Sequence, residues 1–299
     1  MSLPPFRFAG ARAVLTGAAS GMGEQMALQL ADRGAEQVLV DRDAARLEGV
    51  AAQIGRQHPG TTVHLEVADL ADTAAIDGLV ERILAVFPEI DLLVNNAGVA
   101  LGGSFADLTA EEFDWVMAIN FAAPVALCRG LLTALRGSAG GHIVNVSSLF
   151  GLIGPPGQSA YSSSKYALRG FSEVLRHELA PAGIGVTTVH PGGIRTRIAE
   201  TARVAANATP EQERAGKAAF SKLLTYPADR AAAQILQGVE RRKGRVLIAS
   251  SAVVPDLLVR LFPVHYADVL QVLQPGAARR AMARSAPTAG VPARPRVKG

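Results

Sequence analysis

The sequence predicts a doubly wound α/β protein, with a parallel sheet of about seven strands and helices on both faces. Three observations support this prediction. Short runs dense in valine, isoleucine and leucine alternate with longer helical segments. These runs lack the polar–apolar alternation of a half-exposed strand, as expected for parallel strands buried on both sides. A glycine-rich turn follows the first run and opens a helix.

The predicted elements follow one another without a repeat or a linker, so we expect one domain over residues 1–274. Thr109, with Glu112 three residues later, forms a capping box that marks one helix start. The predicted strands are 12–16, 37–40, 62–67, 91–95, 142–147, 185–190 and 245–249. The predicted helices are 22–32, 44–56, 73–86, 110–135, 159–180 and 228–242.

The composition is that of a globular protein from a reducing compartment. The chain has 299 residues, 49% of them hydrophobic and 19% charged, which allows a sizeable core. Cys128 is the single cysteine, so no disulfide framework can form. The six histidines lack the spacing of metal ligands, and no metal site is expected. No secretory leader and no uncharged apolar run of ~20 residues is present, so we expect a cytoplasmic protein without a transmembrane segment.

The net charge of +4 has its source at the C-terminal end. After Asp268 there are six basic residues and no acidic one, which leaves −2 for the rest of the chain. Rich in alanine, proline and arginine, residues 275–299 are predicted to form a disordered basic tail. This location argues against nucleic-acid binding; a solubilising tail is favoured over weak attraction to an acidic surface or membrane. The six basic residues are Arg279, Arg280, Arg284, Arg294, Arg296 and Lys298.

The turn after the first strand has the composition of a phosphate-binding loop. Gly17, Gly21 and Gly23 allow a tight turn and a close approach of backbone to a pyrophosphate. The helix that follows would direct its free N–H groups at the anion. The spacing G-x-x-x-G-x-G differs from the general G-x-G-x-x-G pattern, but its position between a strand and a helix favours dinucleotide binding.

Asp41, at the end of the second strand, is the candidate selector of the cofactor. It lies 18 residues after Gly23, near the ~20 expected of an acid that binds a ribose hydroxyl. A carboxylate there would repel a 2′-phosphate, so NAD is favoured over NADP. Arg42 could instead bind such a phosphate through two hydrogen bonds, which keeps NADP as the alternative.

Six motifs occur in order between residues 10 and 250. Together they resemble the short-chain dehydrogenase/reductase family in its ordinary single-domain form, and this resemblance implies a Rossmann-like sheet. The motifs are T-G-x-x-x-G-x-G at 16–23, N-N-A-G at 95–98, Asn120, I-V-N-V-S-S at 143–148, Y-x-x-x-K at 161–165 and P-G-G-I-R-T at 191–196.

The resemblance implies four catalytic residues. Tyr161 would be the acid/base and Lys165 its activator, with Ser148 orienting the substrate oxygen and Asn120 holding a water behind the lysine. Ser147 is the alternative to Ser148. A tyrosine with a pKa of ~10 is a poor base at neutral pH. An ammonium group one helical turn away, together with an oxidised nicotinamide, should lower that pKa.

The resemblance also implies a set of cofactor contacts. Asp69 would face the adenine, and Asn95 would either line the floor beneath the adenosine or brace the sheet. The implied contacts are Gly17, Ser20, Gly21, Met22, Gly23, Asp41, Arg42, Asp69, Leu70, Asn96, Ala97, Gly98, Tyr161, Lys165, Pro191, Gly192, Ile194 and Thr196.

Three segments bear on the substrate and on assembly. Residues 197–226 occupy the place of the family's substrate lid and are predicted to form a mobile helical flap. Residues 149–157 are apolar and would suit a lipophilic alcohol or ketone, although core packing explains them equally well. Residues 252–274 form a C-terminal extension that we expect to pack against the body, rather than to cap the pocket, cover a subunit interface or touch a membrane. The family commonly forms homodimers or homotetramers.

The predicted function is therefore that of an NAD(P)-dependent oxidoreductase that interconverts a secondary alcohol and a ketone. One alternative is an NADPH-dependent carbonyl reductase that acts only in the reductive direction. Another is a non-catalytic NAD-sensing regulatory protein with the same fold. The intact set of Ser148, Tyr161 and Lys165 argues against a sensor, since a sensor has no need of a proton relay.

Overall fold

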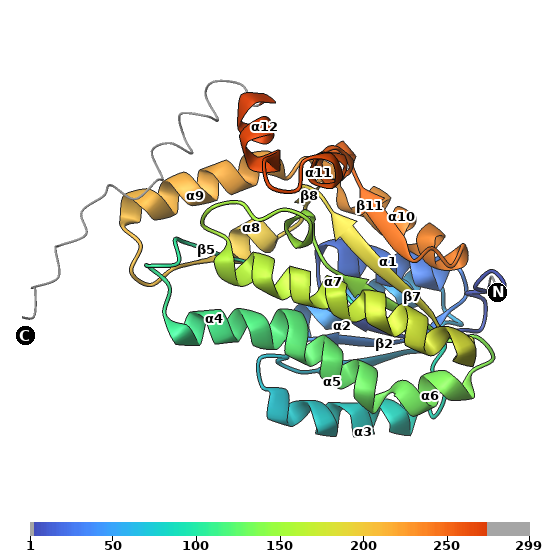
Figure 1. Ribbon diagram of the computed structural model, residues 1–299. Helices are drawn as coiled ribbons and strands as arrows, with labels where there is room; N and C mark the ends of the chain where they lie inside the picture. The colour runs from blue at the N-terminus through green and yellow to red at the C-terminus, as the bar shows by residue number, and fades with distance from the viewer. Residues whose placement is uncertain (1–2, 274–299) are drawn as a thin grey trace, which may run out of the picture.

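A seven-stranded parallel sheet forms the centre of the computed structural model, which describes residues 3–273 (Figure 1). Each strand begins and ends within one residue of its predicted bounds. The strand order is β11-β7-β6-β4-β1-β2-β3. The strands are β1 (Arg12–Thr16), β2 (Glu36–Asp41), β3 (Val63–Val67), β4 (Leu92–Asn95), β6 (His142–Val146), β7 (Gly185–Pro191) and β11 (Arg245–Ile248).

The order of the strands reverses at β1. From β1 the chain moves outward through β2 to β3, and then returns to place β4 on the other side of β1. The register pairs Leu15 of β1 with Leu39 of β2 on one side and with Val94 of β4 on the other. In sheets of this kind the ligand binds beyond the carboxyl ends of the strands at the reversal, here between β1 and β4.

Helices cover both faces of the sheet, as predicted (Figure 1). One layer consists of α1 (Gly21–Asp32), α2 (Ala44–Gln57) and α10 (Ala228–Glu240), whose leucines, isoleucines and Met26 share one core with the sheet. The second core lies on the other side and includes side chains of α3 (Ile76–Val86) and of the helices between β4 and β7. These two cores account for the predicted two-faced burial of β1, β2, β4, β6 and β7, whereas β3 and β11, at the two edges of the sheet, are only partly buried.

The predicted helix 110–135 is divided into shorter segments. It begins at α4 (Ala110–Met117), where Glu112 N donates to Thr109 Oγ1 at 3.2 Å and Thr109 N to Glu112 Oε2 at 3.0 Å, confirming the capping box. A π-helical turn, Ala118–Ala122, then interrupts the α-helical pattern. It is followed by α5 (Ala123–Gly130) and α6 (Leu132–Gly137), while the next helix, α7 (Ser159–Leu179), is continuous.

Short elements gather beyond the carboxyl ends of the strands. The loop after β4 forms β5 (Leu101–Gly102), which pairs with β9 of the predicted lid. The turn after β7 forms β8, which pairs with β10 at the end of that lid. The remaining bounds are η1 (Thr73–Ala75), η3 (Leu149–Gly151), η4 (Ala180–Ala182), β8 (Ile194–Arg195), α8 (Ile198–Thr201), β9 (Arg203–Val204), α9 (Pro210–Leu223) and β10 (Tyr226–Pro227).

The C-terminal extension forms two helices, α11 (Ser250–Leu261) and α12 (Tyr266–Leu273). One side of α11 packs against the body, as expected for the extension, and its other side is exposed. The predicted tail, residues 275–299, lies outside the described residues. Within residues 3–273, no helix combines the length and apolar composition that crossing a membrane requires.

Candidate active site

The glycine-rich turn between β1 and α1 has the conformation that a phosphate-binding loop needs. Gly17 and Gly21 have φ angles of +68° and +59°, a region that side chains disfavour. A Cβ at Gly23 would overlap the carbonyl oxygen of Gly17, so the turn closes tightly only because no side chain is present there. Ser20 occupies the N-cap position of α1 without a side-chain capping bond, and Met22 packs on the core.

The loops after β1 and β4 are bound to each other at the strand reversal. The Thr16 hydroxyl oxygen accepts N–H bonds from Asn96 and Ala97, both at 3.1 Å. In return, Asn96 Nδ2 donates to the carbonyl oxygens of Thr16 at 3.0 Å and Gly17 at 3.1 Å. Thr16 was not among the predicted site residues, although it opens the T-G-x-x-x-G-x-G motif; its hydroxyl fixes both loops.

Asp41 lies at the end of β2, beside the glycine-rich turn. Its Oδ2 accepts the backbone N–H of Ala19 at 3.0 Å, and its Oδ1 accepts that of Asp43 at 3.1 Å. The carboxylate is half-buried. Asp41 therefore lies at the edge of the sheet, where a ribose-binding acid was predicted. It also acts as a turn residue, because its two hydrogen bonds hold the glycine-rich turn and the loop after β2 together.

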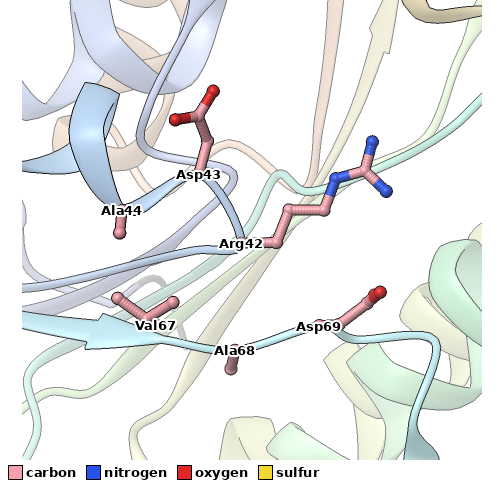
Figure 2. A pocket seen from close by; sticks show the side chains of 6 residues that line it. All are labelled: Arg42, Asp43, Ala44, Val67, Ala68 and Asp69. Carbon is pink, nitrogen blue, oxygen red and sulfur yellow. The ribbon is translucent and has the colours of Figure 1, made fainter.

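An open depression of about 650 Å³ lies beyond the ends of β2 and β3. Arg42 and Asp69 line it, and Figure 2 shows their side chains extending to the same side. Arg42 has no hydrogen-bond or ion-pair partner within residues 3–273, whereas Asp69 Oδ1 accepts the N–H of Ala71 at 2.9 Å. Leu70 is buried in the core beside the depression. A polar pocket lined by one free guanidinium and by the carboxylates of Asp43 and Asp69 therefore adjoins Asp41.

The turn after β7 reaches back to the glycine-rich turn. Gly192 N donates to Ile248 O, and Ile194 N to Gly192 O, both at 3.0 Å, which sets the bend directly after Pro191. Ile194 is buried. The side chain of Thr196 packs so closely on Gly21 that a Cβ there would lie 3.0 Å from it.

These positions fit a dinucleotide. The carboxyl ends of the strands from β3 to β7 bring the predicted contacts to one edge of the sheet, although the residues lie far apart in sequence. At Gly98, an added Cβ would approach Asn120 Oδ1 and Lys165 Nζ to 3.2 Å each, so the absence of a side chain keeps the floor of the site open. Glycines occupy the positions where the protein backbone would approach a bound cofactor most closely.

Tyr161 lies on the first turn of α7 with its side chain buried. Its hydroxyl is hydrogen-bonded with that of Ser148, and the ring of Phe150 meets its ring edge-on at a centroid distance of 6.1 Å. Burial raises the pKa of Tyr161, and the Ser148 hydrogen bond lowers it in part. The expected lowering of the pKa below its ordinary value does not occur in the protein alone, because burial is the larger effect.

Lys165 lies one turn further along α7, as the i, i+4 spacing predicts. Its Nζ is 5.8 Å from the centroid of the Tyr161 ring and donates to the carbonyl oxygen of Val146 at 3.0 Å. Burial lowers the pKa of Lys165 to about 8. The lysine is therefore held behind the tyrosine by the end of β6, in an environment that disfavours its charge.

The two serines that end β6 are distinguished by their partners. Ser147 is buried and donates its hydroxyl to the carbonyl oxygen of Lys165 at 2.8 Å, so it fixes α7 to the sheet. Ser148 is half-buried, accepts the N–H of Phe150 at 3.1 Å and neighbours Tyr161. The geometry thus agrees with the choice of Ser148 over Ser147.

Asn120 lies in the π-helical turn and is fully buried. Its Oδ1 accepts the N–H of Val99 at 2.9 Å, and its Nδ2 donates to Val99 O and to Ser164 Oγ, both at 3.0 Å. Protein groups thus bind both ends of the side chain, and a water held by Asn120 stays a prediction. Ser164, whose pairing with Asn120 sequence reasoning missed, lies directly before Lys165.

Asn95 braces the sheet. Its Nδ2 donates to Asn145 Oδ1 at 2.8 Å across β4 and β6, and Cys128 Sγ lies 3.4 Å from the same nitrogen. Burial raises the pKa of Cys128 to about 12, so the thiol stays protonated. Within the described residues, no group of three or more His, Cys, Asp or Glu side chains could hold a metal ion.

Comparison with known proteins decides the family. A family model described as short chain dehydrogenase matches residues 11–207. The chain belongs to the short-chain dehydrogenase family. One relative is a Mycobacterium tuberculosis protein that bears the name of an oxidoreductase, SadH. It is 35% identical to this short-chain dehydrogenase over 262 residues, which cover 87% of this chain and 93% of the relative.

Two solved short-chain dehydrogenases share the fold. The Burkholderia phymatum enzyme, in complex with NAD, has a TM-score of 0.77 and 27% identity over 86% of this chain and 95% of its own. The Burkholderia cenocepacia enzyme, in complex with NADP, has a TM-score of 0.70 and 32% identity over 83% of this chain and 100% of its own. This short-chain dehydrogenase is thus a Rossmann-like oxidoreductase of a family whose members bind NAD or NADP.

Proposed function

We propose that this short-chain dehydrogenase interconverts a secondary alcohol and a ketone, with Tyr161 as the acid/base. The observation that carries the proposal is the group formed by the buried Tyr161 and Lys165 with the half-buried Ser148 at the carboxyl edge of the sheet. When bound, the nicotinamide would supply the chemistry of hydride transfer. The protein's part is to bind and orient the alcohol and to move its proton.

Tyr161 would exchange a proton with the substrate oxygen through its phenol. Ser148 neighbours that phenol, so its hydroxyl can hold the same oxygen and stabilise charge that develops there. Burial raises the pKa of Tyr161 in the protein alone, so the phenolate requires positive charge nearby. The Lys165 ammonium group provides part of that charge, and Nζ has donors beyond its bond to Val146 O for holding the cofactor's ribose.

Asn120 acts in this proposal as a positioning residue. Its amide links the loop after β4, through Val99, to Ser164 on the helix that carries both Tyr161 and Lys165. A π-helical turn at this point is a feature that often marks functional sites. The role follows from what the side chain binds.

We infer a lipophilic substrate and NAD as the favoured cofactor. Phe150 packs on the edge of Tyr161, which presents an aromatic wall to the reacting group. Leu152 and Ile153 are core residues, so they do not add to that wall. Asp41 supports NAD by its carboxylate beside the glycine-rich turn. The segments α8 to β10 would cover the substrate as the lid.

An NADPH-dependent carbonyl reductase is the second candidate, and one observation favours it. The Arg42 guanidinium has no partner within residues 3–273 and lines the depression next to Asp41 (Figure 2). A free guanidinium there could bind a 2′-phosphate. In that case the enzyme would act chiefly on ketones.

The deciding experiment is a titration of the purified protein with NADH and NADPH, followed by nicotinamide fluorescence. We expect tighter binding of NADH, and in Asp41→Ala about tenfold weaker NADH binding with improved NADPH binding. A panel of secondary alcohols and ketones with the tighter-binding cofactor then tests turnover. Tighter NADPH binding in the unaltered protein would select the reductase; no binding of either would overturn the oxidoreductase assignment of this site.

We further propose a cytoplasmic homodimer or homotetramer, with residues 1–274 as its single catalytic domain. The single cysteine supports a reducing compartment. On the outer side of α7, Tyr166 and Val174 are exposed, which supports α7 as a subunit contact. Light scattering of the full chain measures the assembly.

A further inference from the structure

The helix α11 presents an apolar face to solvent. Val253, Val254, Leu257 and Leu261 lie at positions i, i+1, i+4 and i+8, which share one side of a helix. Phe262 and Val264 continue the apolar surface beyond the helix end. These six residues, named here the α11 ridge, have exposed side chains, between 47% and 78% of their full area.

The opposite side of α11 is anchored, so the ridge cannot turn inward. Ala252 and Pro255 are buried against the body. Asp256 is buried as well and pairs with Arg245 on β11, and Arg260 Nε lies 3.2 Å from its Oδ2. The usual arrangement of a surface helix is therefore inverted: its ion pair faces the protein and its leucines face outward.

The α11 ridge lies beside the mouth of the proposed active site. Ser251 Oγ, at the start of α11, accepts the N–H of Gly193 in the turn after β7 at 3.2 Å. The end of α9 meets the same turn, where Leu223 is exposed and a Cβ at Gly193 would overlap its carbonyl oxygen. Figure 1 shows α9, α11 and α12 along one end of the molecule, beyond the sheet.

The sequence directly after these helices is strongly basic. Six arginine and lysine residues follow Asp268, and no acidic residue does. The remainder of the chain has a net charge of −2, so the positive charge is concentrated next to the ridge in sequence. An apolar helix face followed by a cationic segment is complementary to a surface that is apolar within and anionic at its boundary.

We propose that the α11 ridge and the basic segment after it dock this protein on an anionic membrane surface. α11 lies in the plane of the interface, with its leucines and valines among the acyl chains near the headgroups. The basic residues bind the anionic lipid headgroups, an attraction that salt screens. This goes beyond the proposed reaction and does not depend on it. Docking in this way would place the mouth of the proposed active site next to the lipid bilayer, in which lipophilic molecules are dissolved.

The test is sedimentation of the full chain with vesicles of phosphatidylcholine, and with vesicles of phosphatidylcholine that contain phosphatidylglycerol. Three variants are compared with the unaltered protein. The ridge variant is Leu257→Glu with Leu261→Glu, and the tail variant replaces the six basic residues by glutamine. The matched control is Ala52→Glu with Gln57→Glu on α2, which adds the same two charges at exposed positions outside the ridge and outside the proposed subunit contact.

We expect the unaltered protein and the α2 control to sediment with the anionic vesicles and not with phosphatidylcholine alone. The ridge variant should bind at least tenfold more weakly, and the tail variant should lose binding as the unaltered protein does in high salt. In a Leu261→Trp variant, the fluorescence should shift to shorter wavelength with anionic vesicles by more than that of the unaltered protein, which checks insertion independently of any fold defect.

Three results would overturn the proposal. The first is an unaltered protein that stays in the supernatant with both kinds of vesicle. The second is a ridge variant that binds as well as the control. The third is a ridge variant that changes the oligomeric mass in light scattering while vesicle binding is absent throughout, which would make the ridge a face between copies of this chain.

Discussion

At the amino edge of the sheet, the side chains of Arg12 and Arg242 bind partners within the chain, whereas at the carboxyl edge the side chain of Arg42 does not. Arg242 donates to the carbonyl oxygens of Pro4, Gly140 and Gly141 and lies over the ring of Phe6. Across the sheet, the Arg42 guanidinium has no partner within residues 3–273. The sheet thus carries paired arginines at one edge and an unpaired guanidinium at the other.

This difference between the two edges indicates that the amino edge serves mainly stability and the carboxyl edge mainly function. The amino edge joins segments that are distant in sequence, as when Arg12 Nε donates to Asp91 Oδ2 at 2.9 Å. The carboxyl edge keeps a buried lysine, a feature that disfavours folding but suits a ligand. Substitutions at the two edges should therefore separate loss of activity from loss of stability.

The largest expected effect is on turnover at the carboxyl edge. Tyr161→Phe removes the proposed acid/base hydroxyl, so turnover should fall by about 10²- to 10⁴-fold. Cofactor affinity and melting temperature should stay near those of the unaltered protein, because the ring still packs against Phe150. Tyr166→Phe, five residues along the same helix and exposed, is the control and should keep full activity. Near-normal turnover in Tyr161→Phe would contradict the assignment.

The next effect is on stability at the amino edge. Arg242→Met leaves three carbonyl oxygens and His142 Nδ1 without their donor, which should lower the free energy of unfolding by about 2–4 kcal/mol. Turnover per folded molecule should not change. Arg241→Met is the control, since Arg241 is exposed and its side chain has no partner in the described part of the chain. Chemical denaturation measures the free energy of unfolding of both variants. Equal values for Arg242→Met and Arg241→Met would show that the Arg242 network contributes nothing to stability.

A smaller effect on stability accompanies a loss of binding at Gly23. In Gly23→Ala the new Cβ meets the backbone of Gly17, so cofactor binding should weaken more than tenfold and unfolding should become easier by about 1–3 kcal/mol. Gly55→Ala is the matched control, because no atom lies within 4 Å of its new Cβ in the helix α2. It should stabilise the protein by up to about 1 kcal/mol. The prediction fails if the two variants bind cofactor equally.

The last expected effect is a pH dependence of stability that originates at the amino edge. Burial and the charge of Arg242 lower the pKa of His142 from 6.5 to about 3. Below pH 6.5 the unfolded chain therefore takes up a proton that the folded chain refuses. Stability is complete above that pH and falls as pH decreases toward 3, by about 1.4 kcal/mol per unit for one proton.

His142→Gln is the variant that isolates this pH dependence. It removes the contribution of His142 and leaves that of His190, whose pKa burial lowers to about 4. The free energy of unfolding, measured by denaturation between pH 4 and pH 7, should depend less steeply on pH in the variant, because one proton is no longer coupled to unfolding. The same slope in both proteins would show that His142 does not resist protonation.

The sequence by itself determined the sheet and the main elements of the site. Valine, leucine and isoleucine density is a local property, so each of the seven strands was predicted to within one residue. The glycine-rich turn and the i, i+4 spacing of Tyr161 and Lys165 are local as well, because helix geometry alone puts those two side chains on one face. The capping box at Thr109 and Glu112 was predictable for the same reason.

Only the tertiary structure decided which polar groups meet. Asn120 binds the backbone of Val99, 21 residues away, and this bond lies where the predicted long helix is interrupted. Arg242 reaches Pro4 across 238 residues, a pairing that no local pattern contains. The outward face of α11 depends on the ion pair that Asp256 makes with β11. Such contacts depend on how segments pack in space, whereas the elements themselves depend on the order of neighbouring residues.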